Sequence, residues 1–353
     1  MLVSDFDFDL PSELIAQEPP TERGLSRLLQ CERATGALYH HAMADLPALL
    51  ESGDLLVVNN TRVFPARLLG HRDPSGGAVE CLLVTRLEPA DATGAELWEA
   101  LVHPGQKLKP GARAVFGGST PLHAEILERR LFGRRVVRLR TLDGSPVEGA
   151  VDAIGHMPLP PYIKRLDSGS DRERYQTVYA QERGSIAAPT AGLHFTPALL
   201  TALEARGVQR AEVTLHVGYG TFQPIRVAEV EAHRMESEQF EISEGAAATI
   251  NAALDRGRRV IAVGTTTTRT LESVARQHQG RIVAGRGASD LFIYPGFEFK
   301  VLSGLVTNFH LPQSSLLMLV SAFGGREHVL NAYREAVAQR YRFYSYGDAM
   351  LVI

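Results

Sequence analysis

The sequence is poor in cysteine, with Cys31 and Cys81 as the only two among 353 residues. They lie too far apart for a CxxC motif, which excludes the common metal and redox motifs of that type. The most apolar stretch of the C-terminal third, residues 316–323, is far shorter than the roughly 20 residues that a membrane helix needs. The first residues are acidic, where an export signal would be basic and then apolar. We therefore expect a cytoplasmic protein without a membrane span.

Three widespread catalytic motifs are missing as well. No GxxxxGK[ST] phosphate loop occurs, and residues 218–223 depart from the GxGxxG dinucleotide pattern at its last position. No HExxH zinc motif is present, and the 12 histidines are scattered along the chain. The sequence thus gives no indication of hydride or phosphoryl transfer. We expect neither a metal ion nor a resident cofactor.

What is present is the composition of an ordinary globular protein. Hydrophobic residues make up 44% of the chain and charged residues 22%, which excludes disordered and collagen-like classes. The formal net charge of −3 provides no general attraction to a polyanion. Any binding of nucleic acid must therefore depend on a local basic patch.

The periodicity of the chain predicts a mixed α/β fold with an insertion. Asp45 and Pro47 are typical of a helix start, and residues 54–58 read as a buried strand that follows. Short alternating runs broken by glycine fill residues 66–151 and indicate a small antiparallel β-barrel-like domain. From residue 190 onward helices and strands alternate again. One of these helices begins with Thr196 as its cap and Pro197 as its first residue. We therefore assign residues 1–62 and 152–353 to a discontinuous α/β catalytic domain, and residues 63–151 to an inserted β-domain.

Several polar segments follow predicted strands, where ligands commonly bind in α/β folds. Asn308 and His310 would point to the same side of a regular strand that Pro312 ends. The other such segments are residues 59–62, 187–196, 216–222 and 263–269. Free backbone N–H groups at a following helix start, glycines and hydroxyls would all suit a polar ligand. The alternative interpretation of each segment is a capped helix or a tight turn.

The most basic stretch is residues 128–140, with six arginines and one glutamate, a local charge of +5. Arg138 and Arg140 would share one face of a strand, so that a β-hairpin could present them to phosphate groups. We expect Arg134, Arg135, Arg138 and Arg140 to bind the phosphate groups of a nucleic acid. The alternative is a hairpin face that is merely solvated.

Taken together, these segments resemble the S-adenosylmethionine:tRNA ribosyltransferase-isomerase family of queuosine biosynthesis. The resemblance runs along nearly the whole chain and is therefore far more specific than a single short pattern. The matching segments are residues 5–11, 59–67, 155–163, 175–179, 187–195, 307–312 and 341–349.

The resemblance implies that S-adenosylmethionine is a consumed ribosyl donor. The acceptor would be the aminomethyl group of 7-aminomethyl-7-deazaguanine in tRNA, and the products epoxyqueuosine-tRNA, adenine and methionine. As general acid or base we select His194, His216 and His310, because imidazole titrates near neutrality and each follows a strand or precedes a helix. The polar substrate contacts expected from motif position are Asn59, Thr61, Arg62, Thr190, Thr266, Arg269 and Asn308.

Two other functions fit parts of this pattern. One is a non-catalytic tRNA-binding protein, which would need no imidazoles near a pocket. The other is an S-adenosylmethionine-dependent tRNA methyltransferase, which would release S-adenosylhomocysteine in place of adenine and methionine. Whichever function applies, we expect the protein to be a monomer.

Overall fold

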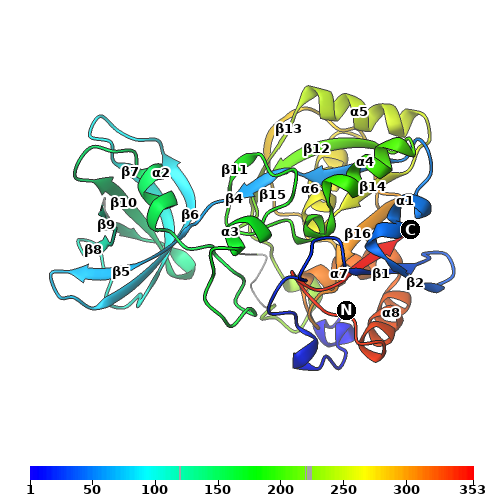
Figure 1. Cartoon of the computed structure of the whole chain (residues 1–353), viewed down its shortest axis with the longest axis horizontal. Helices are drawn as coiled ribbons and strands as arrows, with labels where there is room; N and C mark the ends of the chain where they lie inside the picture. Colours follow the sequence, from blue (N-terminus) through cyan, green and yellow to red (C-terminus); the bar gives the residue numbers. More distant parts are fainter. Residues whose placement is uncertain (119–120, 219, 221–224) are drawn as a thin grey trace.

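The computed structural model describes residues 1–118, 121–218, 220 and 225–353. An α/β part and a smaller barrel lie side by side, joined by a narrow neck (Figure 1). Tyr219, Thr221 and Phe222 of the predicted segment 216–222 lie outside the described residues.

The α/β part is built around one mixed sheet, which has nine strands within the described part of the chain. The central strands are buried along their whole length, as expected where helices cover both faces of a sheet. In spatial order the strands are β15 (Gly285–Ser289), β13 (Glu238–Ile242), β12 (Gln209–Leu215), β3 (Leu55–Asn59), β14 (Val260–Val263), β16 (Gly304–Asn308), β17 (Ala349–Val352), β1 (Arg27–Cys31) and β2 (Leu38–Ala42).

Helices pack on both faces of this sheet. One face packs against α5 (Glu244–Asp255), α6 (Thr265–Gln277), α7 (Ser315–Gly324) and α8 (Arg326–Ala338). The opposite face packs against α1 (Leu46–Leu49), α4 (Pro197–Ala205) and the 3₁₀ helix η5 (Thr190–His194). Alternate residues of β3 enter the two cores, with Val57 on the first side and Val58 on the second.

The helix starts follow from local sequence. The Thr196 hydroxyl accepts a hydrogen bond from the Leu199 N–H at 3.0 Å, and Pro197 is the first residue of α4. Ser243 caps α5 in the same way. The apolar residues 316–323 lie in α7, which packs in the core. No helix within the described ranges is long and apolar enough to cross a membrane.

The barrel is a closed antiparallel sheet with the cyclic order β10, β7, β6, β5, β8, β9. Its strands are β5 (Arg67–Asp73), β6 (Ala78–Glu88), β7 (Glu96–His103), β8 (Arg113–Phe116), β9 (Leu122–Arg129) and β10 (Arg134–Thr141). Helix α2 (Val147–Ile154) packs against its core through Val147, Ala150 and Val151. The predicted α/β fold with an antiparallel barrel is confirmed. The domain limits at residues 63 and 151 stay a prediction.

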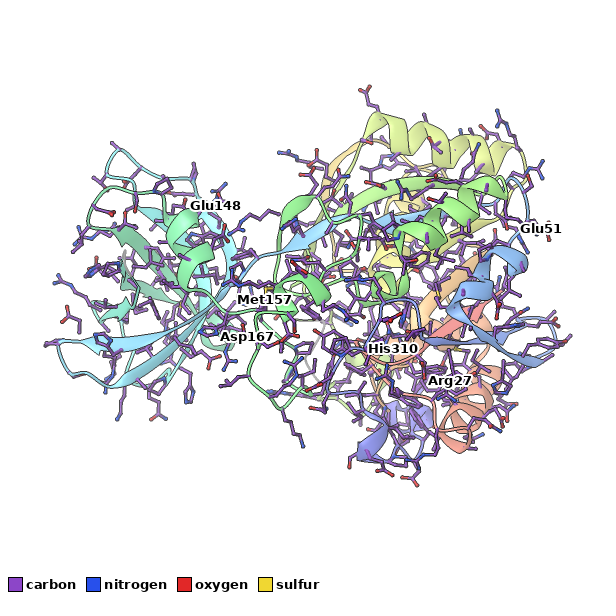
Figure 2. All side chains as sticks on the ribbon, viewed as in Figure 1. Arg27, Glu51, Glu148, Met157, Asp167 and His310 are labelled. Carbon is purple, nitrogen blue, oxygen red and sulfur yellow. The ribbon has the colours of Figure 1, made fainter. Side chains whose placement is uncertain are left out.

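The neck contains the short parallel pair β4 (Thr61–Val63) and β11 (Glu182–Ser185), with α3 (Asp171–Arg174) beside it. Met157 and Asp167 lie where the barrel meets the α/β part (Figure 2). The Asp167 carboxylate accepts hydrogen bonds from the Met157 N–H at 2.9 Å and from the His156 ring at 2.8 Å. This carboxylate therefore fixes the chain as it leaves the barrel.

Candidate functional site

The strand directions bring distant polar segments to one edge of the sheet. Strands β12, β3, β14 and β16 are parallel, so their carboxyl ends meet at the same edge. β17 runs antiparallel to β16 and β1 runs parallel to β17. The segments that precede β17 and β1 therefore reach this edge too. Ligands in open α/β sheets commonly bind at such an edge.

A cavity lies at this edge, and we call it the pocket. Its walls come from residues 187–191, the start of α6, the end of β16, residues 344–345 and Tyr162. Of the predicted site residues, the pocket is lined by Thr190, Thr266, Asn308 and His310. Figure 2 shows His310 inside the α/β part, away from the barrel.

The start of α6 gives the pocket unpaired hydrogen-bonding groups. Gly264 adopts φ of 90°, which a residue with a side chain rarely adopts, and leads directly into the first turn. The Thr267 hydroxyl donates to the Val263 carbonyl at 2.8 Å. The buried Thr266 hydroxyl has no hydrogen-bond partner among the described residues. This hydroxyl can therefore hydrogen-bond to a ligand, and the free N–H groups of the turn favour an anion.

His194 and Asn308 form a buried chain of hydrogen bonds behind the pocket. The Asn308 Nδ2 group donates to the Tyr344 carbonyl at 3.0 Å and contacts His194 Nε2 at 2.9 Å. Because Nδ2 is a donor in both contacts, His194 Nε2 is the acceptor and the proton lies on Nδ1. Nδ1 then donates to the Ser26 hydroxyl at 2.8 Å. Burial lowers the pKa of His194 to about 4, so the ring is neutral at physiological pH.

His310 is the one predicted histidine that lines the pocket as described. Its Nε2 lies 2.9 Å from the Thr307 hydroxyl, and within the described chain no partner is found for Nδ1. Burial lowers the pKa of His310 to about 3. Burial therefore shifts both rings away from the near-neutral titration on which the selection of His194 and His310 rested. β16 ends at Asn308, before His310 and well before Pro312. The directions of the Asn308 and His310 side chains therefore do not follow from the alternation of one regular strand.

Two tyrosines that line the pocket, Tyr162 and Tyr344, were not selected as site residues from the sequence, although residues 342–348 combine aromatic and polar side chains that suit stacking on a purine. The Tyr162 and Tyr344 rings meet edge to face with centroids 3.8 Å apart, and the Tyr162 hydroxyl is hydrogen-bonded to Ser345. Tyr344 has φ of 73°, an uncommon conformation for a residue with a side chain. Both tyrosines lie in segments that carried the family resemblance, and this was the available signal. They give the pocket an aromatic wall suited to a purine.

Besides His194, four predicted site residues near β3, β4 and β12 lie outside the pocket lining formed by the described residues. The Asn59 amide is used within the sheet, since Nδ2 donates to the Leu215 carbonyl and Oδ1 accepts from the Leu215 and Thr61 N–H groups. The Thr61 hydroxyl contacts His216 Nδ1 at 2.8 Å. Arg62 is exposed on β4. These positions fit an interpretation in which Asn59, Thr61 and His216 join β3, β4 and β12.

Arg269 is also outside the pocket lining, in a buried ion pair with Glu238. Its Nε donates to the Leu291 carbonyl at 2.9 Å. Glu238 accepts a hydrogen bond from the Gly218 N–H at 3.0 Å. Arg269 thus fixes β13 and the segment that follows β12, a position that suits support of the pocket better than substrate contact.

The four barrel arginines differ in their surroundings. Arg134 is paired with Glu99 and Glu236. Arg135 is buried, and its guanidinium donates to the backbone carbonyls of Leu108 and Gly105. Arg138 and Arg140 are both exposed on one face of β10, as predicted. The expected charge of +5 is partly neutralised, because Arg138 also lies 3.5 Å from Glu125.

The protein is an α/β sheet with an inserted barrel. The polar, aromatic pocket at its strand ends is typical of proteins that bind a small polar ligand. A sequence profile described as "Queuosine biosynthesis protein" matches residues 3–352. The chain is 51% identical to the S-adenosylmethionine:tRNA ribosyltransferase-isomerase of Desulfitobacterium hafniense and 53% identical to that of Heliobacterium modesticaldum. Both alignments cover all of each chain.

A solved structure agrees with these sequence comparisons. The crystal structure of S-adenosylmethionine tRNA ribosyltransferase from Thermotoga maritima has a TM-score of 0.55 and 38% identity, covering 99% of this chain and 100% of the other. The chain belongs to the queuosine biosynthesis protein family, and the resemblance inferred from the motifs is confirmed.

Proposed function

We propose that this chain transfers and isomerises the ribosyl group of S-adenosylmethionine onto the aminomethyl group of 7-aminomethyl-7-deazaguanine in tRNA. The products are epoxyqueuosine-tRNA, adenine and methionine. The observation that carries the proposal is the first turn of α6 in the pocket, where the Thr266 hydroxyl lacks a partner among the described residues. These donors suit the methionine carboxylate, and the walls at Tyr162 and Tyr344 suit adenine. Family membership supports the same activity.

The chemistry requires proton transfers in a site shielded from water. The sulfonium of S-adenosylmethionine acidifies the C5′ protons, so a base can remove one of them. The resulting carbanion opens the ribose ring and expels adenine, which takes up a proton. The acceptor amine bonds to the sugar, and epoxide closure then releases methionine. The reaction involves no net oxidation or reduction, and the roles of base and acid suit groups within the pocket.

Within this reaction we assign proton transfer to His310 and a positioning role to His194. His310 lines the pocket, whereas both ring nitrogens of His194 are engaged by Ser26 and Asn308. His194 thereby orients the Asn308 amide, which itself lines the pocket. His216 keeps no role in the chemistry, because it contacts Thr61 outside the pocket lining of the described residues.

Product analysis tests the proposed function directly. Incubation with S-adenosylmethionine and precursor-bearing tRNA should release adenine and methionine in a 1:1 ratio, in proportion to modified tRNA. A methyltransferase would give S-adenosylhomocysteine, and a binding protein would give no small product. Release should persist with a chelator present, since no metal is expected. Failure of adenine to appear would refute the proposed reaction.

Thr266 and Thr267 provide a matched pair for testing the pocket. Thr266→Val should weaken S-adenosylmethionine binding by about 10-fold or more, since a hydrogen bond to a charged group contributes about 1.5–3 kcal/mol. Its unfolding free energy should hold or rise, because an unpaired buried hydroxyl is removed. Thr267→Val should do the reverse, costing about 1 kcal/mol of stability without affecting affinity. Calorimetric titration and urea unfolding measure the two effects, and equal decreases in affinity would contradict this assignment.

We assign tRNA contact on the barrel to Arg138 and Arg140, which share the exposed face of β10. The double exchange to glutamine should weaken tRNA binding and reduce the slope of log affinity against log salt by roughly 0.7–0.9 for each phosphate group that is no longer bound. Affinity for S-adenosylmethionine should not change. Binding titrations at several salt concentrations measure this, and an unaltered slope would leave the face merely solvated. A monomeric state and a cytoplasmic location remain predictions.

A further inference from the structure

A second, small cavity lies behind His194. We call it the arginine cavity, because Arg23 and Arg174 line it together with Ser26, His194, Ser345 and Tyr346. Ser345 lines the pocket as well, and His194 is hydrogen-bonded to Asn308 of the pocket. The two cavities are therefore separated by little more than one layer of side chains.

The two arginines hold neighbouring segments together through backbone carbonyls. Arg23 donates to the carbonyls of Gln176 at 2.8 Å and Glu173 at 3.1 Å. Arg174 donates to the carbonyls of Thr21 at 3.1 Å and Pro20 at 2.5 Å. Each arginine thus reaches into the segment that carries the other. Both guanidinium groups are fixed in place before any ligand is bound.

Neither arginine has a carboxylate partner within the described chain, and no acidic side chain there lines the cavity. Several other partly or fully buried arginines of the α/β part have carboxylate partners, as Arg269 has Glu238 and Arg165 has Asp171. Burial and the neighbouring charge of Arg174 lower the pKa of the Arg23 guanidinium. Two partly buried positive charges without a counter-ion are unfavourable, and an anion in this cavity would relieve that cost.

Ser26 adds a third donor to the cavity. Its hydroxyl oxygen accepts the Nδ1 proton of His194 at 2.8 Å. No acceptor for the hydroxyl's own proton is found in the part of the chain that the structure describes. That proton is available to a ligand. Two guanidinium groups and a hydroxyl match the several acceptor oxygens of a phosphate or carboxylate.

We propose that Arg23, Arg174 and Ser26 form an oxyanion site that binds a phosphodiester of the RNA strand beside the nucleotide held in the pocket. This inference rests on the proposed function, in which one tRNA base enters the pocket. An enzyme that acts on a single base binds it splayed out of the strand, which brings the flanking phosphates close to the entrance. The methionine carboxylate is the other oxyanion source, but the start of α6 already offers it donors inside the pocket.

The test compares single exchanges in the full chain by titrating an anticodon stem-loop RNA at several salt concentrations. Arg23→Gln and Arg174→Gln should each reduce the salt slope by roughly 0.7–0.9, the value for one phosphate contact. Arg23→Lys should keep the wild-type slope, because lysine keeps the positive charge although it lacks the paired hydrogen bonds of arginine to the carbonyls. A role confined to holding the segments would lower affinity without changing the slope. Thermal unfolding of each variant checks that it remains folded.

Arg172→Gln is the matched control. Arg172 also donates only to carbonyls, those of Asp152 at 2.9 Å and Gly155 at 2.7 Å, and it lies outside the lining of the arginine cavity. The exchange removes the same charge two residues from Arg174. An equal slope change in Arg172→Gln would show a general effect of charge and would overturn the site.

A second titration identifies the source of the oxyanion. If the RNA slope is unchanged while Arg23→Gln abolishes discrimination between S-adenosylmethionine and its decarboxylated analogue, the site binds the methionine carboxylate and the phosphodiester assignment is overturned. Unchanged RNA slope and unchanged S-adenosylmethionine affinity overturn the oxyanion site altogether. Failure of the proposed function would be a separate result, in which the wild-type protein binds RNA but releases no adenine.

Discussion

His310→Gln should lower the turnover number by about 10²–10⁴-fold, the usual contribution of a general acid–base group. The ring lines the pocket, and its Nε2 is oriented by the Thr307 hydroxyl. Glutamine keeps a polar side chain of similar length but cannot carry a proton between reacting atoms. His216→Gln should lower turnover by less than about tenfold, because that ring contacts Thr61 away from the described pocket lining. Single-turnover measurement of adenine release compares the two.

The pH dependence of the same reaction gives a further check on His310. Its pKa is lowered to about 3 by burial, so the ring should stay neutral between pH 5 and pH 8. The profiles of kcat/KM against pH should therefore have the same shape in the wild type and in His310→Gln over that range. A step near pH 6 to 7 that the exchange removes would contradict the burial argument, and a near-normal turnover in His310→Gln would place proton transfer on another group.

The parts of the fold that follow from local sequence could be predicted. α4 begins where Thr196 and Pro197 supply a cap and a suitable first residue, and β3 largely coincides with the apolar run expected at residues 54–58. Alternation along residues 66–151 indicated strands, and β6, β7, β8 and β10 coincide with its alternating runs. Closure of the barrel depends on the pairing of β10 with β7 and β5 with β8. Such pairings join distant segments, which periodicity does not specify.

The candidate site was only partly accessible to sequence reasoning, for a similar reason. Thr266, Asn308 and His310 reach the pocket because parallel strands end at a common edge. Asn59 follows such a strand too, but its amide is used by Leu215, which lies 156 residues away. Whether a polar side chain faces a ligand or the sheet depends on partners that only the folded chain reveals.

Burial changes the properties of the histidines in a way that spacing along the chain cannot show. His194 contacts Ser26, 168 residues away, and Asn308, 114 residues away. These contacts enclose the ring and lower its pKa to about 4. The sequence placed the imidazole correctly before a helix but could not reveal that it is held neutral there. This enclosure is why His194, expected from the sequence as a proton carrier, is proposed here to position Asn308.

The buried histidines should make the protein sensitive to acid. Their folded-state pKa values of about 4 for His194 and about 3 for His310 lie below the ordinary value of about 6.5. Between these values the unfolded chain binds more protons than the folded chain, so stability is complete above about pH 6.5 and falls as the pH is lowered. From pH 8 to pH 5 each histidine should cost about 2 kcal/mol of unfolding free energy.

Urea unfolding at pH 8 and pH 5 isolates this effect when the difference between the two pH values is compared among variants. His310→Gln and His194→Gln should each reduce the pH-dependent decrease in stability by about 2 kcal/mol, and the double exchange by about 4 kcal/mol. Carboxylates that also titrate contribute equally to every variant and cancel. If His310→Gln retained the whole decrease, the ring would have to be accessible to protons in the folded state, and its enclosure in the pocket wall would be wrong.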